Sequence, residues 1–378
     1  MNFETIGLKP ELIAGLNKQG VTEPIGIQDK MFSAILSGND IMACSQTGSG
    51  KTLGYLLPIF QRQEDIQNGL QVVILVSTHE LGLQVHRQIE LLAANSGISI
   101  RSAAVFGNAN INLQIKALKT KPQIVVGTPG RVLDLMQKKY IPAHLAKTII
   151  VDEGDLLLNC KNIKLTSAVI KKALRDTQLV VVSASIHKDT KAVVESIGKH
   201  PDVIQQAEKL SIPSTITHIC VACEEREKPE YIRKLMAAIK PAKALAIINN
   251  RDLLEKVAEK LRYHNISADY IHGESTQQDR KRIMNAFKSG KLKLLLTTDL
   301  ATRGLDFDDI SVVFSMTASE SPNDYLHKAG RTGRCGKDGM CISLVSPKEI
   351  PMYQACEKQF GIKMQKKYLR EGKLVDQK

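Results

Sequence analysis

Three carboxylates follow an apolar segment in TIIVDEGD (148–155), where Asp152, Glu153 and Asp155 stand around Gly154. Acids at the end of a strand often form only a solvated turn, and this segment taken alone favours that explanation. A functional explanation needs a cation and a phosphate group near the carboxylates. The rest of the sequence must therefore supply both.

The segment DIMACS is followed by SQTGSGKTLGYLLPIF, which predicts a strand, a glycine-bearing loop and a helix. A P-loop has Gly, four residues and then Gly-Lys-Ser/Thr. Here Ser45 takes the first glycine position, and Gly50, Lys51 and Thr52 complete the pattern. Backbone N–H groups of such a loop surround phosphate oxygens at the positive end of the helix. The loop residues expected to bind the phosphate groups of a nucleotide are Ser45, Gln46, Thr47, Gly48, Ser49 and Gly50.

This loop gives the acidic segment a function. Lys51 is expected to reach the β- and γ-phosphates, and Thr52 to bind Mg²⁺. In P-loop enzymes a carboxylate at the end of another strand helps to hold the metal, and Asp152 is the candidate. Glu153, the next residue, is expected to polarise the water that attacks the γ-phosphate.

Eleven short apolar segments alternate with helical patterns along the chain. Such segments suit strands that are covered on both faces, and their alternation with helices predicts mostly parallel α/β sheets. The segments are DIMACS, QVVILVS, QIVVGT, TIIVDE, LVVVSAS, ICVAC, ALAIINN, ADYIHG, KLLLTTD, SVVFSM and CISLVS. Ligands of open α/β sheets bind beyond the carboxyl ends of the strands, which is where the residues named above lie.

The apolar segments fall into two similar halves, and the polar, proline-containing stretch AEKLSIPSTI (207–216) separates them. We therefore expect a domain over residues 1–208, a linker over 209–216 and a second domain over 217–378. A single closed eight-stranded barrel fits the number and grouping of the segments poorly.

The formal net charge of +13 over 378 residues suits a polyanionic partner, either nucleic acid or a membrane surface. No run approaches the ~18 apolar residues of a membrane-spanning helix. The first residues, MNFETIGLKPEL, lack the order of charged and apolar residues that marks a signal peptide. We expect a soluble, intracellular protein in the cytoplasm, with an organellar location left open.

Seven cysteines are scattered through the chain, an odd and dispersed set that is typical of reduced thiols. Cys220 and Cys223 form a CxxC, but no second pair or histidine pair follows at the spacing of zinc ligands. Both residues stand on the predicted strand ICVAC, where they would point to opposite faces. A chance pairing is therefore favoured over a metal site.

The motifs SQTGSGKT, VDEGD, SAS (183–185) and HKAGRTGR (327–334) together resemble those of the DEAD-box RNA helicases of superfamily 2. The resemblance covers essentially the whole chain, with the motifs in the family's order. It implies two tandem RecA-like domains. It also implies an enzyme that uses ATP and Mg²⁺, hydrolyses ATP when RNA binds, and locally separates or remodels RNA duplexes.

The resemblance assigns further residues to the nucleotide. GVTEPIGIQ (20–28) looks like the family's Q motif, in which Gln28 would read the adenine edge and Phe3 would stack on the base. Asp306 would contact the sugar, and Arg331 and Arg334 would act as arginine fingers. The residues that would couple the nucleotide to RNA are Asp155, Ser183, Ser185 and His327.

RNA is the partner that the resemblance implies. The residues that would contact RNA, or brace the loops that do, are Thr78, Gly107, Thr128, Gly130, Arg131, Asn250, Arg251, Gly273, Gln277, Arg280, Thr298 and Arg303. Aromatic residues make up only 4% of the chain and tryptophan is absent, so platforms for base stacking are poorly supplied. We expect sequence-tolerant, salt-sensitive binding of the backbone by a monomer, with protein partners unknown.

The chain departs from the family pattern at several positions. Ser77 and His79 stand where proline and arginine are usual, and Asn108 replaces a second glycine. Gly154 replaces the alanine of the DEAD motif, and Lys328 replaces the first arginine of HKAGRTGR. Lysine keeps the charge but loses the bidentate fork of a guanidinium group.

Three alternatives remain at this stage. A degenerate ATP-gated RNA clamp with little turnover is suggested by the departures from the pattern. A DNA-directed superfamily 2 translocase would share the fold but not the adenine-reading GVTEPIGIQ segment. A small-molecule kinase would share only the P-loop and leave the second half of the chain without a function.

Overall fold

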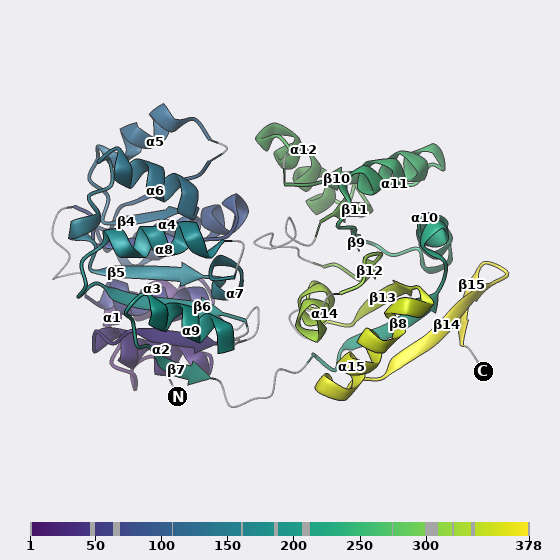
Figure 1. Ribbon diagram of the computed structural model, residues 1–378, viewed down its shortest axis with the longest axis horizontal. Coiled ribbons are helices and arrows are strands. Elements are labelled where there is room, and N and C mark those ends of the chain that lie inside the picture. The colour runs from purple at the N-terminus through teal and green to yellow at the C-terminus, as the bar shows by residue number, and fades with distance from the viewer. Residues whose placement is uncertain are drawn as a thin grey trace. The chain divides into compact units, whose positions relative to one another are not determined.

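The structure is a computed structural model that describes residues 2–45, 50–62, 69–107, 109–159, 162–184, 188–205, 212–273, 275–298, 309–319, 321–333 and 337–376. The chain divides into unit 1, Met1–Glu208, and unit 2, Lys209–Lys378, each built around one sheet (Figure 1). Of the predicted linker, residues 209–211 lie outside the described residues. Ile212 and Ile216 pack into the core of unit 2.

Unit 1 contains a seven-stranded sheet with the strand order β3-β4-β2-β5-β6-β1-β7. All its described strand pairs are parallel, so the carboxyl ends of the strands meet at one edge. The strands are β1 (Ile41–Cys44), β2 (Val72–Leu75), β3 (Ser102–Val105), β4 (Ile124–Gly127), β5 (Thr148–Asp152), β6 (Gln178–Ser183) and β7 (Asp202–Gln205).

Helices cover both faces of the sheet of unit 1 (Figure 1). Alternate residues of the strands pack to opposite sides. One face packs against α1 (Pro10–Asn17), α2 (Ile27–Leu36), α3 (Lys51–Gln61) and α4 (His79–Ser96). The other packs against α5 (Ile111–Leu118), α6 (Pro129–Gln137), α7 (Gly154–Leu157), α8 (Ile163–Lys172) and α9 (Lys188–Ser196). A short 3-10 helix, η2 (Ala143–Leu145), precedes β5. Burial on both faces explains the continuous apolar runs in the sequence.

Unit 2 contains an eight-stranded sheet with the order β10-β11-β9-β12-β13-β8-β14-β15. The described pairs are parallel except β14 and β15, which form an antiparallel hairpin at the edge. The strands are β8 (Ile216–Ala222), β9 (Ala244–Ile247), β10 (Ala268–Ile271), β11 (Leu294–Thr297), β12 (Val312–Ser315), β13 (Gly339–Val345), β14 (Met364–Arg370) and β15 (Lys373–Asp376).

The sheet of unit 2 is also covered on both faces. Helices α10 (Lys228–Ile239) and α11 (Arg251–Tyr263) pack on one face. Helices α12 (Gln277–Lys288), α14 (Pro322–Ala329) and α15 (Ile350–Phe360) pack on the other. Two 3-10 helices, η3 (Glu225–Glu227) and η5 (Pro347–Glu349), lead directly into α10 and α15.

The eleven predicted strands are present, but the sequence does not predict β3, β7, β14 or β15. The segment of β3, SAAV, has little of the apolar bulk by which the other strands are recognised. Strand β7 is a mostly exposed edge strand, and β14 and β15 are rich in charge because only part of each is covered. Edge strands need less burial than central ones, so their composition resembles that of loops.

None of the described helices combines the length and the apolar composition that crossing a membrane requires.

Candidate functional site

The phosphate-binding segment of unit 1 lies between β1 and α3. Strand β1 ends at Cys44 and α3 begins at Lys51, while residues 46–49 lie outside the described residues. Gly50 has a positive φ of 69°, and a Cβ atom there would lie 2.3 Å from Nε2 of Gln28. The left-handed backbone conformation therefore favours glycine at this position, and a Cβ atom would also displace the amide end of Gln28.

Lys51 lies beside the acidic cluster of residues 152–155. Its Nζ donates to the carbonyl oxygen of Ser45 at 2.5 Å. Burial lowers the pKa of Lys51, and the nearby charges of the acidic residues, Asp152 first among them, oppose this change. The lysine and the carboxylates thus share one electrostatic environment at the carboxyl edge of the sheet.

Asp152, the last residue of β5, is held by a tyrosine. The hydroxyl of Tyr55 donates to Oδ2 of Asp152 at 2.9 Å, and Oδ1 accepts the backbone N–H of Glu153 at 2.9 Å. Burial raises the pKa of Asp152, while the Tyr55 hydrogen bond and the charge of Lys51 oppose the rise. Burial and the adjacent carboxylate raise the pKa of Tyr55 well above its ordinary value, so the tyrosine remains a neutral donor.

Glu153 forms the turn between β5 and α7. Its φ is 56°, in the left-handed region that non-glycine residues seldom adopt, and such conformations cluster at functional sites. Its carboxylate Oε2 accepts a hydrogen bond from the hydroxyl of Ser77, which follows β2. Ser77 is one of the departures from the family pattern, and the proline usual there has no group that could donate this bond.

Asp155 is held by Ser183 at the end of β6. The backbone N–H of Asp155 donates to Oγ of Ser183 at 3.1 Å, and that hydroxyl donates to Oδ1 of Asp155 at 3.0 Å. The structure thus brings together the predicted pair Asp155 and Ser183. The other predicted member, Ser185, lies outside the described residues.

Each of the three carboxylates therefore has its own hydroxyl donor. The strands β2, β5 and β6 are neighbours in the sheet, which explains how their ends supply Ser77, the acids and Ser183. Sequence reasoning did not identify Tyr55 or Ser77 as partners. For Tyr55 the signal was present, because it lies four residues after Lys51 and hence on the same face of α3.

The two residues assigned to adenine are buried in unit 1. The side chain of Gln28 is 2% exposed, donates from Nε2 to the carbonyl of Gly50 at 2.9 Å and accepts the N–H of Ile25 at 2.9 Å. It thereby ties the turn before α2 to the phosphate-binding loop. Phe3 is 1% exposed within the core. The recognition of adenine by these side chains stays a prediction.

The segments of unit 1 assigned to RNA are tied to one another. Arg131 donates to the carbonyl of Gly107 at 2.7 Å and to Oε1 of Gln114 at 3.1 Å. The ring of His79 lies 4.4 Å from that of Phe106, between centroids. Arg131 and His79 therefore both brace the loop that follows β3.

Two threonines assigned to RNA stand at the N-termini of helices. Thr78 caps α4 by accepting the N–H of Leu81 at 3.2 Å, and Thr128 is the N-cap residue of α6. Helix N-termini are ready sites for phosphate oxygens. Gly130 lies in the first turn of α6, so it too belongs to this end of the helix.

The residues of unit 2 assigned to RNA follow β9, β10 and β11, which are neighbours in the sheet. Asn250 caps α11 by accepting the N–H of Leu253 at 3.0 Å, and the next residue, Arg251, is exposed. Arg280 donates to the carbonyl of His272 at 2.7 Å, which fixes the loop that contains Gly273. Burial lowers the pKa of Arg280.

The segment HKAGRTGR spans the end of α14. His327 lies in the last turn, Lys328 is 1% exposed and Arg331 is 6% exposed. Nζ of Lys328 donates to the carbonyl oxygens of Thr317 at 2.9 Å and of Ala318 at 3.4 Å. This lysine, which replaces an arginine of the family, thus holds the loop after β12.

Several predicted site residues lie outside the described part of the chain. They are Gln46, Thr47, Gly48, Ser49, Ser185, Arg303, Asp306 and Arg334, together with the side chain of Gln277. Asn108, a departure from the family pattern, also lies outside the described residues. Thr298 is described and directly follows β11, and its carbonyl accepts the hydroxyl of Thr297 at 3.3 Å.

The two cysteines of the CxxC lie on opposite faces of the sheet of unit 2. Cys220 packs with α14 and α15, and Cys223 packs with α10 and α11. Burial raises the pKa of Cys220 to about 12 and that of Cys223 to about 11, so both remain protonated thiols at neutral pH.

Comparison with protein families gives two matches. Residues 25–193 match the model of the DEAD/DEAH box helicase family, and residues 227–336 match that of the helicase conserved C-terminal domain. The chain is 36% identical to the DEAD-box ATP-dependent RNA helicase CshC of Bacillus cereus, over 98% of this chain and 94% of that protein. It is 34% identical to the probable ATP-dependent RNA helicase YfmL of Bacillus subtilis, over 95% and 94% of the two chains.

Comparison with solved structures supports the same fold. Dbp5 of Saccharomyces cerevisiae bound to RNA and ADP BeF3 superposes with a TM-score of 0.84 at 25% identity. The match covers 97% of this chain and 95% of that one. The two sheets flanked by helices are thus the tandem RecA-like domains that the sequence predicts.

Proposed function

The chain belongs to the DEAD/DEAH box helicase family, and from this premise we propose that it is an ATP-dependent RNA helicase. It hydrolyses ATP when RNA binds and locally separates or remodels RNA duplexes. The observation that carries this proposal is the cluster of Lys51 with Asp152, Glu153 and Asp155 at the carboxyl edge of unit 1. A nucleoside triphosphate with its metal ion requires a lysine for the phosphates and a carboxylate for the metal.

The residues present fit Mg²⁺, which prefers hard oxygen ligands and binds through one or two carboxylates together with phosphate oxygens. Asp152 and Thr52 would hold it. When bound, the ion would offset the charge that develops on the phosphates. Two residues of the chain act directly on the reactants: Lys51 holds the β- and γ-phosphates, and Glu153 orients the attacking water.

Arg331 and Arg334 stabilise the charge of the transition state in this proposal, by carry-over from the family motif. The RNA-contacting residues named above bind the sugar–phosphate backbone, with little preference for sequence. Because this binding replaces counterions on the RNA, its affinity should fall steeply as salt rises. The assignment of each of these residues, and the cytoplasmic location, stay predictions.

An ATPase assay on the full chain tests the proposal. RNA should stimulate ATP hydrolysis, and Lys51→Ala should abolish it, whereas Lys164→Ala, which removes an exposed lysine of α8, should leave it unchanged. Arg331→Ala should spare ATP binding but slow turnover, since an arginine finger contributes about 10³–10⁵-fold. Absence of hydrolysis in the wild-type protein with RNA would refute the enzyme assignment.

The alternatives are weaker. An ATP-gated clamp with little turnover finds no support in the comparisons, in which the relatives named above are ATP-dependent RNA helicases. A DNA-directed translocase predicts that DNA stimulates hydrolysis at least as well as RNA, so the same assay with both polymers separates the two. A small-molecule kinase predicts hydrolysis that neither polymer changes.

A further inference from the structure

Two buried ammonium groups hold the loop that follows β12 in unit 2. Nζ of Lys228 donates to the carbonyl of Met316 at 2.9 Å, and Nζ of Lys328 donates to those of Thr317 and Ala318. The hydroxyl of Ser315 is a third donor to this loop, and it donates to the carbonyl of Thr317 at 3.0 Å. Residues 316–318 are called the carbonyl loop below.

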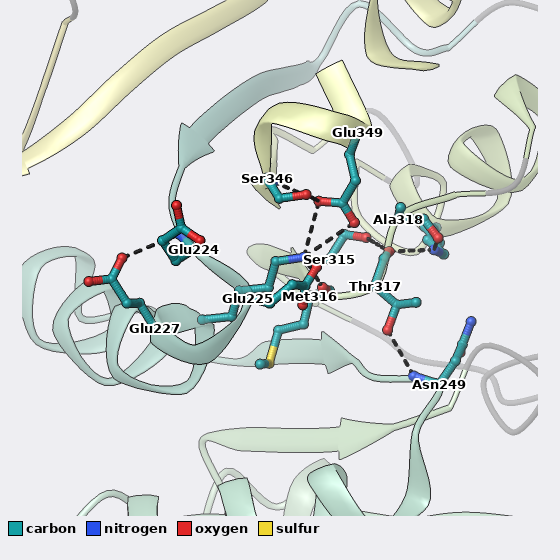
Figure 2. Close-up of polar contacts among 12 residues, drawn as sticks. Glu224, Glu225, Glu227, Asn249, Ser315, Met316, Thr317, Ala318, Ser346 and Glu349 are labelled. Atoms are coloured by element: carbon teal, nitrogen blue, oxygen red, sulfur yellow. Dashed lines mark hydrogen bonds and ion pairs between the residues drawn. The ribbon is translucent and has the colours of Figure 1, made fainter. Parts of the chain in front are cut away.

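Lys228, the first residue of α10, is fixed independently of the loop. Its side chain is 1% exposed, and its Nζ lies 2.6 Å from Oε1 of Glu225 and 3.1 Å from Oε2 of Glu349. Figure 2 shows Glu349 bonded in turn to Ser346, whose N–H and hydroxyl donate to Oε2 at 2.6 and 2.9 Å. The ammonium group is therefore anchored at the junctions of η3 with α10 and of η5 with α15.

Stability alone accounts poorly for this arrangement. Desolvation of a buried ion pair often cancels its attraction, and well-packed apolar residues frequently stabilise a protein as much. What a buried, fully bonded ammonium group supplies is a fixed geometry, because each hydrogen bond constrains the atoms at both ends. For Lys228 the constrained atom outside its ion pairs is the Met316 carbonyl oxygen.

The carbonyl loop contacts two segments that carry proposed functions. The backbone N–H of Asn249 donates to the hydroxyl of Thr317 at 3.0 Å, a hydrogen bond that Figure 2 draws as a dashed line. Asn249 directly precedes the RNA-side residues 250 and 251. On the other side, Lys328 connects the loop to the end of α14, three residues before Arg331.

We propose that Lys228 is a positioning residue for ATP hydrolysis. Through the carbonyl of Met316 it fixes the carbonyl loop, and the loop in turn sets the position of Arg331 through Lys328 and that of segment 249–251 through Thr317. The inference rests on the proposed function, because it assumes that Arg331 acts on the transition state. Among the described residues, Nζ of Lys228 bonds to Glu225, Met316 and Glu349, and none of these is assigned to ATP or RNA.

The test compares RNA-stimulated ATP hydrolysis of the full chain in four variants. Lys228→Met and Lys328→Met each remove one ammonium group, and Lys328→Arg keeps donors for the carbonyls. Lys234→Met is the matched control, since Lys234 is an exposed lysine on the same helix, α10. Thermal unfolding verifies that every variant is folded at the assay temperature.

Lys228→Met should lower kcat by about tenfold or more, because a misplacement of about 1 Å at a reacting group can cost about 10²-fold. The KM for ATP should stay within about twofold, because the residues proposed to hold the β- and γ-phosphates lie in unit 1. Lys328→Met should behave in the same way, while Lys328→Arg and Lys234→Met should retain turnover. If Lys228→Met does not fold, Lys228→Met/Glu349→Gln, which also removes the orphaned carboxylate, replaces it.

Combining the two lysine substitutions distinguishes a shared loop from two independent effects. Residues that act through one element are strongly non-additive, so Lys228→Met/Lys328→Met should be about as slow as the slower single variant. A folded Lys228→Met protein with kcat within about twofold of wild type would overturn the proposal. Rate losses that multiply in the double variant would overturn it as well.

Hydrogen exchange provides a readout that does not depend on activity. In Lys228→Met the amide of Asn249 should exchange faster, because its acceptor on Thr317 is no longer fixed, whereas amides of unit 1 should be unchanged. Unchanged protection of Asn249 would contradict the proposal. If wild-type protein shows no RNA-stimulated hydrolysis, the proposed function fails, and the exchange experiment still decides whether Lys228 fixes the loop.

Discussion

Replacing Gly154 by the alanine of the DEAD motif should destabilise unit 1. Gly154 is the first residue of α7, and a Cβ atom there would lie 2.5 Å from Cγ1 of Val181 on the neighbouring strand β6. Ordinary carbon contacts lie at about 3.5–4.0 Å, so a shift of about 1 Å is needed. Val181 is 0% exposed and β-branched, and its side chain is therefore poorly able to give way.

The expected loss follows from two opposing effects. Inserting a methyl group into a packed core costs about 1–3 kcal/mol, whereas replacing glycine by alanine within a helix gains up to about 1 kcal/mol. Gly154→Ala should therefore lower the free energy of unfolding by up to about 2 kcal/mol if the full helical gain applies, and by up to about 3 kcal/mol if none of it does. For a unit of this size the midpoint of thermal unfolding falls by about 2–4 °C per kcal/mol.

Four proteins suffice for the measurement: wild type, Gly154→Ala, Val181→Ala and the double variant, each unfolded by heat and by urea. Val181→Ala removes the obstructing methyl group, so Gly154→Ala should cost less in that background, by about 1 kcal/mol or more. The other near neighbours of the added atom, at 3.6 and 3.8 Å, are ordinary contacts. Equal costs in both backgrounds, or a gain of stability with Val181 in place, would refute the reasoning.

Three further predictions follow from the contacts of the site. Tyr55→Phe removes the hydroxyl that holds Asp152, so unit 1 should lose about 1.5–3 kcal/mol of stability and ATP hydrolysis should need a higher Mg²⁺ concentration. Thermal unfolding measures the first effect and a Mg²⁺ titration of the ATPase activity the second. Unchanged values in both would contradict the assignment of Asp152 to the metal. Ser77→Ala should lower kcat several-fold and leave the KM for ATP unchanged, because Glu153 loses the hydroxyl donor that orients it. Ser77→Thr keeps the hydroxyl and is the control, and equal kcat in wild type and both variants would disprove the role. Burial lowers the pKa of His218 to about 4, below its ordinary value of about 6.5 in the unfolded chain. The unfolded protein therefore binds this proton at a higher pH than the folded protein, and the stability of unit 2 should fall as pH decreases from about 6.5 to 4. In urea unfolding His218→Gln should flatten this decline, and an identical decline would exclude His218 as its source.

Central strands were predictable from the sequence because burial on both faces demands uninterrupted apolar residues. Strand β2, VVIL, is buried at every position, and β4 and β9 are likewise buried throughout. The edge strand β7 and the hairpin of β14 and β15 have no such demand, and their charged sequences gave no signal. Edge strands form because their backbone pairs with a neighbouring strand. This pairing depends on the sheet, and the sequence of the segment alone does not reveal it.

The site was predictable to the level of residue types and strand ends, but not of partners. Asp155 and Ser183 were expected to meet, and they do, 28 residues apart in the sequence. The pairing of Tyr55 with Asp152 spans 97 residues, and that of Ser77 with Glu153 spans 76. Such contacts depend on the order of strands in the sheet, which local patterns do not encode.

The choice of hydroxyl groups as partners explains why the acidic cluster can exist at the end of a buried strand. Three carboxylates within four residues repel one another, and burial adds to the cost of their charge. A hydroxyl donor satisfies a carboxylate oxygen without neutralising it, whereas a lysine or arginine in the same place would cancel the negative field. Tyr55, Ser77 and Ser183 thus hold the carboxylates in position without neutralising them, and the charge of Lys51 opposes that of Asp152. In the proposed function, a cation that arrives with a phosphate ligand would add to the compensating charge, so the binding of that ligand would help to stabilise the cluster in its charged form.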